Sequence, residues 1–462
     1  MNLNTLSEAL AEKQLFGNGQ REITGYSIDS RTIEAGHLFF ALPGEQVDGH
    51  RFVGEALAKG ASGAVVSRLP QGLDPYLARA GLIVVPGVLQ ALQQLATAMR
   101  LKAGIPVVAV TGSNGKTTTK DLIAAVLGSQ YSTLKTEGNF NNELGLPLTL
   151  LSLKESHRIA VLEMGMRGLG QIRELCRIAR PDYGVITNIG TAHYELLGSQ
   201  ENIAKAKGEL PHSLPDKGTA ILNRDDPWCF RLGVELKQKR PDLSIIYYGF
   251  HQSAWVRATG LEHLNTGVGF QVVWEGKSYQ AYLPLPGAHN VQNALAAIAV
   301  GLINDISLKT CIDGLARVVV SEKRLAQVAG MNGSTIIDDT YNANPGSVVA
   351  SLEVLASAAG KRKIAVLGTQ RELGALAEKG HRNVGAKVAD LEIDLLLTVG
   401  VEAQWMADEA LRQGMEAKQV YSLNNNQEAI QMLQQLLRPG DVVLVKGSRA
   451  LAMEEIVRGV TG

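Results

Sequence analysis

An apolar strand followed by a glycine-rich loop and a Lys-Thr pair is the feature that most constrains this chain. It reads VVAVTGSNGKTTT over residues 107–119. Gly112 and Gly115 let backbone N–H groups face a phosphate, and a helix starting at about Lys116 adds the positive end of its dipole. The Lys116 ammonium can reach the β- and γ-phosphates, and the Thr117 hydroxyl can bind Mg²⁺. The segment predicts a nucleotide-phosphate site on a βα unit.

This loop is shorter than the common phosphate loop GxxxxGKT, which has a glycine where this chain has Val110. The form here is GxxGKT over residues 112–117. The alternative is an ordinary glycine-rich turn with a chance lysine. The phosphate site is favoured because strand, glycines, lysine, threonine and helix coincide. The expected nucleotide contacts in the loop are Gly112, Ser113, Asn114, Gly115, Lys116, Thr117 and Thr118.

Strand and helix patterns alternate along most of the chain, which is typical of parallel α/β sheets. Short alternating runs over 255–283 predict an antiparallel β insertion, and the Ala-rich stretch 291–302 predicts a long helix. The strands of the central block are expected at 107–110, 159–163, 183–187 and 219–222.

These patterns fall into three blocks, in keeping with about 150 residues per domain. The Pro86-Gly87 pair separates the first block from the second, and a new series of alternating strands and helices starts after Val320. We therefore expect domains at 1–86, 87–320 and 321–462. The outer blocks have expected strands at 38–42, 61–67, 82–86, 335–338, 363–367, 395–399, 419–421 and 442–445.

Composition excludes several functional classes. Lys plus Arg and Asp plus Glu are 45 each, so the zero net charge argues against a general nucleic-acid or anionic-membrane binder. The three cysteines form no CxxC pair, which argues against a disulfide framework or zinc site. The N-terminus lacks a signal-peptide pattern, and the longest apolar run, 294–303, is too short to span a membrane. We expect a cytoplasmic enzyme.

Three side chains outside the loop are candidates for chemistry. Glu163 ends a predicted strand, where open α/β sheets bind ligands and a carboxylate can hold Mg²⁺. His193 follows the next strand at the same edge, although a lone histidine is more often structural. Lys207 lies near Lys205 on a predicted helix, and spacing alone suggests a solvated helix face.

Motifs along nearly the whole chain resemble the Mur ligases of peptidoglycan synthesis. In the first block, SIDSR at 27–31 and DGHRF at 48–52 resemble a uridine-nucleotide domain of that family. The resemblance implies a central P-loop ATPase domain with a parallel sheet and a Rossmann-like C-terminal domain. The other shared motifs are GxxGKT, NFNNELG at 139–145, EMG at 163–165, His193, KGE at 207–209, HNVQN at 289–293, Arg324 and DDTYNANP at 338–345.

The resemblance implies an ATP-dependent, ADP-forming amide ligase that acts through an acyl phosphate. The segments YNANP at 341–345 and KGSR at 446–449 imply UDP-N-acetylmuramoyl-tripeptide and D-alanyl-D-alanine as substrates. One alternative is a relative that adds a single amino acid, but its DNPR-like motif is missing. A catalytically silent sensor of ATP or a UDP-sugar is the other, and the intact set of motif residues argues against it.

By the same resemblance, Lys116 neutralises phosphate charge while Thr117 and Glu163 hold a first Mg²⁺. His193 and Lys207 are implied ligands of a second Mg²⁺. An ammonium cannot bind a cation, so Lys207 is implied to be a carbamate formed with CO₂. The further contacts implied for ATP are Asn290 at the adenine and Arg324, Asp338 and Asp339 at the ribose or phosphates, with strand-end capping as the alternative for the two aspartates.

Substrate contacts are also implied residue by residue. Ser30, Arg31, Asp48 and His50 are expected at the UDP, with an ordinary turn as the alternative. Lys446 and Arg449 either fix a carboxylate of the dipeptide or lie on a solvated turn. The remaining implied substrate contacts are Asn139, Asn142, Tyr341 and Asn344.

One turn departs from the family pattern. Residues 368–374 read GTQRELG where the family has an acidic stretch resembling GDMxELG, so Thr369 replaces the usual Asp and Arg371 adds a positive charge. No functional role is carried onto Thr369. We also expect a monomer whose third domain swings onto the central one when nucleotide binds.

Overall fold

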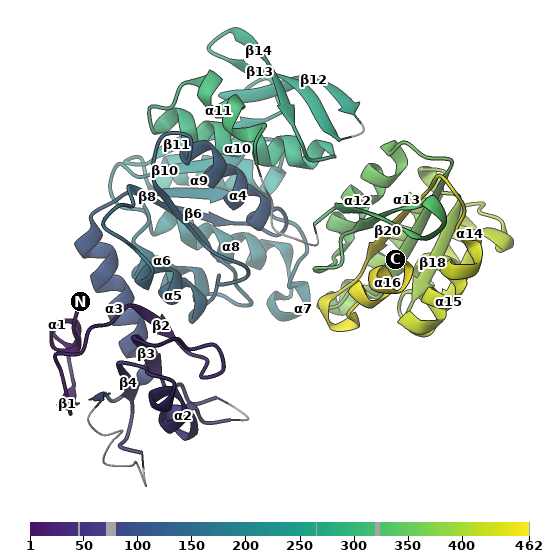
Figure 1. Cartoon of the computed structure of the whole chain (residues 1–462). Helices are drawn as coiled ribbons and strands as arrows, with labels where there is room; N and C mark the ends of the chain where they lie inside the picture. The colour runs from purple at the N-terminus through teal and green to yellow at the C-terminus, as the bar shows by residue number, and fades with distance from the viewer. Residues whose placement is uncertain (45–46, 71–79, 265, 319–323, 462) are drawn as a thin grey trace.

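The computed structural model describes residues 1–44, 47–70, 80–264, 266–318 and 324–461. These residues form three sheets that follow one another along the chain as N-terminal, central and third domains (Figure 1). The predicted α/β fold with three sheet-containing domains is therefore confirmed. The expected boundary between residues 320 and 321 lies outside the described residues.

The N-terminal domain is a five-stranded sheet in the order β1-β5-β4-β3-β2, parallel except for β1. The three strands expected from apolar runs are present. Strands β1 and β2 were not predicted; they have three residues each and carry no fully buried side chain. The elements are α1 Leu3–Ser7, β1 Gln14–Phe16, β2 Gly25–Ser27, β3 His37–Phe40, η1 Gly49–Phe52, α2 Val53–Ala58, β4 Gly63–Val66 and β5 Gly81–Val84.

Helix α3 (Val88–Ala103) follows Pro86-Gly87 and joins the N-terminal and central domains (Figure 1). Its buried Leu92 and Leu95 belong to one apolar core together with Leu38 of the first sheet and Leu150 of the central domain. The helix is therefore part of the packing of both domains.

The central domain has nine strands in the order β14-β13-β12-β11-β10-β9-β6-β8-β7. Strands β6 to β11 are parallel, so their carboxyl ends meet at one edge. This arrangement places the ends of β6, β8 and β9 side by side. The parallel strands are β6 Val107–Thr111, β7 Thr133–Lys135, β8 Ile159–Glu163, β9 Tyr183–Ile186, β10 Thr219–Asn223 and β11 Ser244–Gly249.

The expected antiparallel insertion is the meander of β12, β13 and β14. It is no separate unit, because β12 pairs in parallel with β11 and so lengthens the central sheet. The strands are β12 Val256–Leu264, β13 Gly267–Trp274 and β14 Lys277–Leu283.

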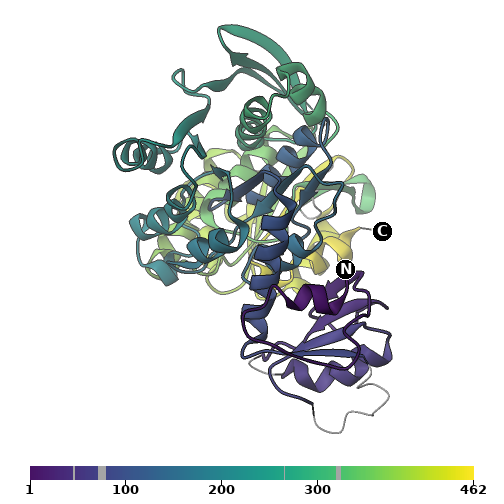
Figure 2. The same ribbon diagram turned by 90° about the vertical axis from the view of Figure 1, so that its left-hand side faces the viewer.

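Helices cover both faces of the central sheet (Figure 2). Helices α4, α10 and α11 pack on one face, where Ile123 and Leu295 share a core. Helices α5, α6, α8 and α9 share the other face with α3. The elements are α4 Lys116–Leu127, α5 Gly145–Leu151, α6 Gln171–Ala179, α7 Tyr194–Leu197, α8 Gln200–His212, α9 Pro227–Lys239, α10 Ala288–Ile303 and α11 Leu308–Leu315.

The third domain has the strand order β15-β16-β20-β17-β18-β19, with only β15 antiparallel. Among the described helices of all three domains, none is long and apolar enough to cross a membrane. The elements are β15 Ala326–Ala329, η3 Met331–Gly333, β16 Thr335–Asp338, α12 Pro345–Ser357, β17 Arg362–Gly368, η4 Gly374–Leu376, α13 Ala377–Asp390, β18 Leu395–Val399, α14 Gln404–Arg412, η5 Ala417–Gln419, β19 Val420–Leu423, α15 Asn426–Leu436, β20 Asp441–Lys446, η6 Arg449–Leu451 and α16 Glu454–Val460.

Candidate active site

The phosphate loop lies between β6 and α4, as predicted, and both of its glycines are required by the local geometry. Gly115 has φ +78°, in the left-handed region that favours glycine. A Cβ at Gly112 would collide with the Thr187 hydroxyl, and one at Gly115 would lie 2.7 Å from the side-chain oxygen of Asn293. The N–H groups of Ser113 and Asn114 donate to the backbone and the side chain of Asn188, which fixes the shape of the loop.

Lys116 lies over this loop, where its Nζ donates to the carbonyl of Gly112 at 2.8 Å. Burial lowers the pKa of Lys116, the Glu163 carboxylate raises it, and the Arg324 guanidinium lowers it again. The ammonium thus lies among charged groups from both the central and the third domain.

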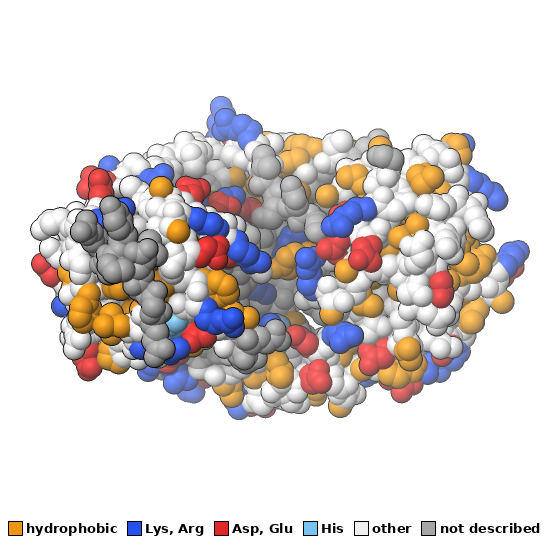
Figure 3. All heavy atoms as spheres, turned by 60° about the horizontal axis from the view of Figure 1, so that its bottom comes forward, with side chains coloured by type: hydrophobic (Ala, Val, Ile, Leu, Met, Phe, Trp, Pro, Cys, Tyr) orange, Lys and Arg blue, Asp and Glu red, His pale blue; other side chains and the backbone are white. Residues whose placement is uncertain are grey.

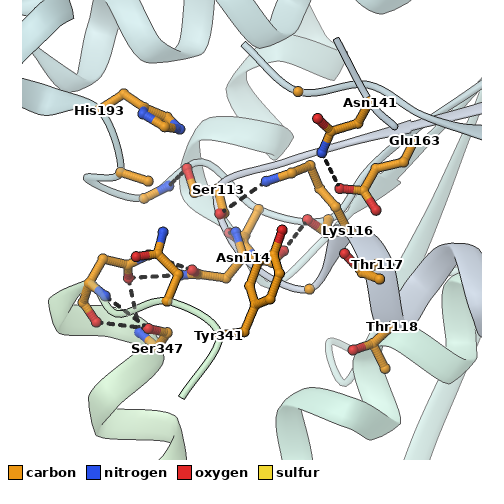
Figure 4. Close-up of a pocket in the computed structure, with 18 of the residues that line it drawn as sticks. Ser113, Asn114, Lys116, Thr117, Thr118, Asn141, Glu163, His193, Tyr341 and Ser347 are labelled. Carbon is orange, nitrogen blue, oxygen red and sulfur yellow. Dashed lines mark hydrogen bonds between the residues drawn. The ribbon is translucent and has the colours of Figure 1, made fainter. Parts of the chain in front are cut away.

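Glu163 ends β8 as a buried carboxylate with only 2% of its surface exposed. Its Oε1 accepts a hydrogen bond from Asn141 Nδ2 at 2.7 Å (Figure 4). Its backbone N–H donates to Thr136 Oγ1 at 3.0 Å. Its Oε2 is buried and has no hydrogen-bond partner among the described residues.

An unpartnered buried carboxylate oxygen is costly unless a donor or a cation satisfies it. Mg²⁺ prefers oxygen ligands from one or two carboxylates or hydroxyls together with substrate phosphates. Glu163 and the hydroxyl of Thr117 therefore fit one Mg²⁺ beside the phosphate loop.

His193 and Lys207 do not build a second cation site by themselves. Burial lowers the pKa of Lys207 well below its usual value, and the nearby Lys116 ammonium acts in the same direction. His193 Nδ1 lies 2.6 Å from Oε2 of Glu372. Among the described residues, no group of three or more His, Cys, Asp or Glu side chains gathers as a metal cluster.

The third domain contacts the phosphate loop directly. Arg324 Nη2 donates to Thr117 Oγ1 at 2.9 Å, and the guanidinium lies 4.4 Å from the centre of the Tyr341 ring. The side-chain amides of Asn114 and Asn344 donate to each other, at 2.6 and 3.2 Å. Asn344 also caps α12. Residues far apart in sequence thus meet at the predicted nucleotide site.

A cavity of about 1270 Å³ lies between the central and third domains and reaches the phosphate loop. The surface is hollowed between the N-terminal and third domains, and Lys and Arg side chains lie beside this hollow (Figure 3). The cavity brings together most of the predicted residues of these two domains, namely Ser113, Asn114, Gly115, Lys116, Thr117, Thr118, Asn139, Asn142, Glu163, His193, Lys207, Asn290, Arg324, Asp339, Tyr341, Asn344, Lys446 and Arg449.

Asp338 and Asp339 differ in their surroundings. The carboxylate of Asp338 accepts from the N–H and the hydroxyl of Thr340, which is the strand-end capping considered as the alternative, and Asp338 does not line the cavity. Asp339 lines it and forms an ion pair with Lys446 at 2.5 Å. Arg449 is paired with Glu454 at 2.7 Å.

Asn290, expected at the adenine, lies at the start of α10. Its Nδ2 donates to Pro286 O at 2.8 Å, and its Oδ1 accepts from Asn293 Nδ2 at 3.1 Å. Both amides line the cavity. The neighbouring His289 is desolvated, which lowers its pKa to about 4.

The four residues expected at the UDP do not line this cavity. Ser30 donates to Glu55 Oε2 at 3.3 Å, and Arg31 pairs with Asp29 at 2.7 Å. His50 is buried, where its Nδ1 contacts Asp48 and its Nε2 accepts from the N–H of Ser67. A second cavity of about 920 Å³ lies between the N-terminal domain, α4 and β7. It is lined by Ser27, Asp29 and Thr32, which are neighbours of Ser30 and Arg31 in the sequence.

Asn141 and Glu372 are among the cavity residues that the sequence prediction did not name. Asn141 holds Glu163, and its place inside the quoted NFNNELG segment was the available sign. Glu372 contacts His193 from the third domain, and the ELG of the turn at 368–374 was the sign there. A phosphate loop, a carboxylate with a free oxygen and cations from a second domain define an enzyme that uses a nucleoside triphosphate.

Comparisons with known proteins identify the family. Residues 22–100 match the model described as "Mur ligase family, catalytic domain", 110–301 match "Mur ligase middle domain", and 323–449 match "Mur ligase, glutamate ligase domain". The chain therefore belongs to the Mur ligase family of ATP-dependent ligases.

Similar sequences and structures span the whole chain. The UDP-N-acetylmuramoyl-tripeptide–D-alanyl-D-alanine ligase of Bacillus subtilis is 38% identical over 95% of this chain and 93% of its own length. The enzyme of that name from Escherichia coli is 36% identical over 94% and 92%. A crystal structure of MurF from Acinetobacter baumannii has a TM-score of 0.87 and 33% identity, and covers 99% of this chain and 98% of its own. MurF from Thermotoga maritima in complex with ADP has a TM-score of 0.80 and 27% identity, and covers 94% and 96%.

Proposed function

We infer that this chain joins D-alanyl-D-alanine to UDP-N-acetylmuramoyl-tripeptide, converts ATP to ADP and phosphate, and forms the UDP-pentapeptide. The observation that carries this inference is the shared cavity, where a phosphate loop and Glu163 of the central domain face Arg324 and Lys446 of the third. Full-length relatives that bear the name of this activity support it.

The chemistry explains why ATP is needed. A carboxylate is a poor electrophile, because an attacking amine would have to expel oxide. The tripeptide carboxylate attacks the γ-phosphorus, the bond to the ADP oxygen breaks, and an acyl phosphate forms. The free amine of D-alanyl-D-alanine then attacks the carbonyl carbon. An amide bond forms, phosphate leaves with the C–O electron pair, and the amine loses a proton to its surroundings.

Positioning and charge neutralisation supply most of the catalysis in phosphoryl transfer. We propose that the N–H groups at the start of α4 and the ammonium of Lys116 hold the β- and γ-phosphates. Thr117 and Glu163 are the residues that would hold Mg²⁺, which neutralises phosphate charge when bound. Asn290, Arg324 and Asp339 belong to the same proposed ATP site, and the pairing of Asp338 with Thr340 supports no such role for Asp338.

We propose that Lys207 is modified to a carbamate. His193 and the anionic oxygen of this carbamate are the groups that would hold a second Mg²⁺. Formation of a carbamate consumes CO₂ and a neutral amine and releases a proton. The burial of Lys207 supports the proposal, because the depressed pKa increases the share of neutral amine.

The three domains are proposed to divide the substrates among them. Residues 1–86 would bind the UDP moiety, 87–320 the ATP, and 321–462 the dipeptide and part of the ATP. The second cavity beside Ser27 and Asp29 favours a UDP site next to Ser30 and Arg31. His50 and Asp48 support this region from within, through their contacts to Ser67 and Arg68.

Within the main cavity, Asn139 and Asn142 are proposed to contact the muramoyl peptide. Tyr341, Asn344, Lys446 and Arg449 are proposed for the dipeptide. Lys446 is paired with Asp339 and Arg449 with Glu454, and each cation keeps further N–H donors for a substrate carboxylate. We also propose that the enzyme works as a monomer in the cytoplasm.

The test is phosphate release from ATP and Mg²⁺ in the presence of UDP-N-acetylmuramoyl-tripeptide, with bicarbonate added to maintain a carbamate. The expected result is release that depends on D-alanyl-D-alanine and a UDP-pentapeptide product by mass spectrometry. Release that requires a single amino acid and a shorter UDP-peptide would instead establish the related ligase. Absence of release with every amine would contradict both.

A further inference from the structure

Glu372 is a third-domain carboxylate that contacts the central domain beside the phosphate loop. Its Oε2 lies 2.6 Å from His193 Nδ1, but the two groups are not aligned as a hydrogen bond. Its backbone carbonyl accepts from the N–H of Glu195 at 3.1 Å. A Cβ at Gly374 would lie only 3.0 Å from the Cα of Glu195. The turn is thus closely docked on α7.

The third domain holds this turn firmly from behind. The N–H of Thr369 donates to Val399 O at 3.1 Å, and that of Arg371 donates to Ser448 Oγ at 2.8 Å. The side chain of Thr369 is buried and packs against Gly400. The departure from the acidic family pattern at this residue therefore leaves the backbone that presents Glu372 intact.

His193 needs such a support. It has φ +64°, which is uncommon for a residue other than glycine, and it comes directly before α7. Among the described residues, no group makes an aligned hydrogen bond to its buried Nδ1, although Glu372 Oε2 lies within reach of it. Which ring nitrogen of a histidine acts on a ligand is set by the partner of the other nitrogen.

We propose that Glu372 is a positioning residue for His193, which it reaches only when the third domain is docked on α7. A rotation of the ring or of the carboxylate would align this 2.6 Å contact, so that the carboxylate accepts a hydrogen bond from Nδ1–H and leaves Nε2 as the ring nitrogen free to act on a ligand. This proposal rests on the proposed function, in which His193 is one of the residues that would hold a second Mg²⁺. The orientation of His193 in the central domain would then depend on the third domain, which is proposed to bind the dipeptide.

The test compares Glu372→Ala and Glu372→Gln with the wild-type enzyme. The ring nitrogens of histidine are labelled with ¹⁵N, and the His193 signal is identified by its loss in His193→Asn. Spectra are recorded without turnover, with a non-hydrolysable ATP analogue and UDP-N-acetylmuramoyl-tripeptide. The wild-type signal is expected to show a protonated, hydrogen-bonded Nδ1, and Glu372→Ala is expected to shift it.

In steady-state assays, Glu372→Ala is expected to lower kcat by about 10- to 100-fold, the range found for partners that orient a ligating histidine. The KM for ATP should stay unchanged. Glu372→Gln should retain more activity, because its amide oxygen still accepts a hydrogen bond. The matched control is Glu378→Ala, which removes an exposed carboxylate that pairs with Arg382 at 2.8 Å within the third domain. This control should match the wild type in both readouts.

The side chain of Glu372 is 44% exposed, so its replacement is not expected to unfold the enzyme, and thermal melting checks this. An unchanged His193 signal in Glu372→Ala would overturn the proposal, as would an unchanged kcat. A lower kcat that Glu378→Ala reproduces would also overturn it. A wild-type enzyme that forms no product would refute the proposed function instead, and the nitrogen spectra would still decide whether Glu372 fixes His193.

Discussion

Replacement of Asn141 by alanine tests whether the hydrogen bond from Asn141 orients the Glu163 carboxylate so that its Oε2 can bind a cation. The Asn141 amide donates to Glu163 Oε1 at 2.7 Å and leaves Oε2 without a hydrogen-bond partner among the described residues. Without that donor, the buried carboxylate loses its only side-chain hydrogen bond in the described residues and can turn away from Thr117. The expected effect is weaker binding of Mg²⁺, with little change in nucleotide binding itself.

The size of the effect follows from the contact. A hydrogen bond to a charged group contributes about 1.5–3 kcal/mol. Since each 1.4 kcal/mol is a tenfold change, Asn141→Ala should raise the Mg²⁺ concentration for half-maximal activity by about 10- to 150-fold. The assay is phosphate release at fixed, saturating ATP over a range of Mg²⁺ concentrations. Binding of a labelled ATP analogue without Mg²⁺ should be close to that of the wild type.

The matched control is Asn202→Ala. Its amide also donates at 2.7 Å, but to the backbone carbonyl of Leu197 and outside the cavity. This variant should keep the Mg²⁺ requirement of the wild type. If Asn141→Ala lowered the maximal rate at an unchanged Mg²⁺ requirement, or if both variants shifted that requirement equally, the assignment of Glu163 to the cation would be refuted.

Three more predictions follow from buried groups around the site. Gly115→Ala should abolish binding of an ATP analogue in calorimetry, because φ +78° and the Asn293 side chain leave no room for a Cβ. The control Gly104→Ala should still bind the analogue, because its Cβ would meet nothing within 4 Å. Lys120→Met should lower the free energy of unfolding by about 1–3 kcal/mol, because the buried Nζ of Lys120 donates to Thr136 O at 2.7 Å. The control Lys205→Met replaces an exposed lysine and should leave the melting temperature unchanged. Burial depresses the pKa of His289 to about 4, below its value of about 6.5 in the unfolded chain. Between these two pH values the unfolded chain binds a proton that the folded chain does not bind. The contribution of His289 to stability is therefore fully present above about pH 6.5 and falls as the pH drops toward 4. His289→Gln should flatten the fall in melting temperature over that interval, and a profile as steep as that of the wild type would contradict the assignment.

Local patterns were sufficient for the elements that build the phosphate site. The residues of β6, the loop and α4 are adjacent in sequence, so the run VVAVTGSNGKTTT contains both the apolar strand and the helix start. Glu163 was located correctly at a strand end because β8 is fully buried, and such strands appear as continuous apolar runs. Short edge strands such as β1 have no such run, which explains why they were missed.

Contacts between domains were not available from the sequence. The pairs Asn114–Asn344 and His193–Glu372 join residues that are 230 and 179 positions apart, and neither pair follows from spacing within an element. Side chains with local partners were also open to misreading, because Asp338 resembles a ligand contact in the motif but caps its own turn. Only the three-dimensional arrangement distinguishes these cases.

The shared core of α3 has a consequence for how the molecule unfolds. Apolar side chains of one face of the N-terminal sheet, of α3 and of one face of the central sheet form a single cluster, whereas those of the third domain form separate ones. Packing continuity of this kind makes neighbouring elements open as one cooperative unit. Calorimetry of the ligand-free enzyme should therefore resolve two transitions rather than three. A nick near residues 86–87 should shift only the transition in which the N-terminal and central sheets unfold.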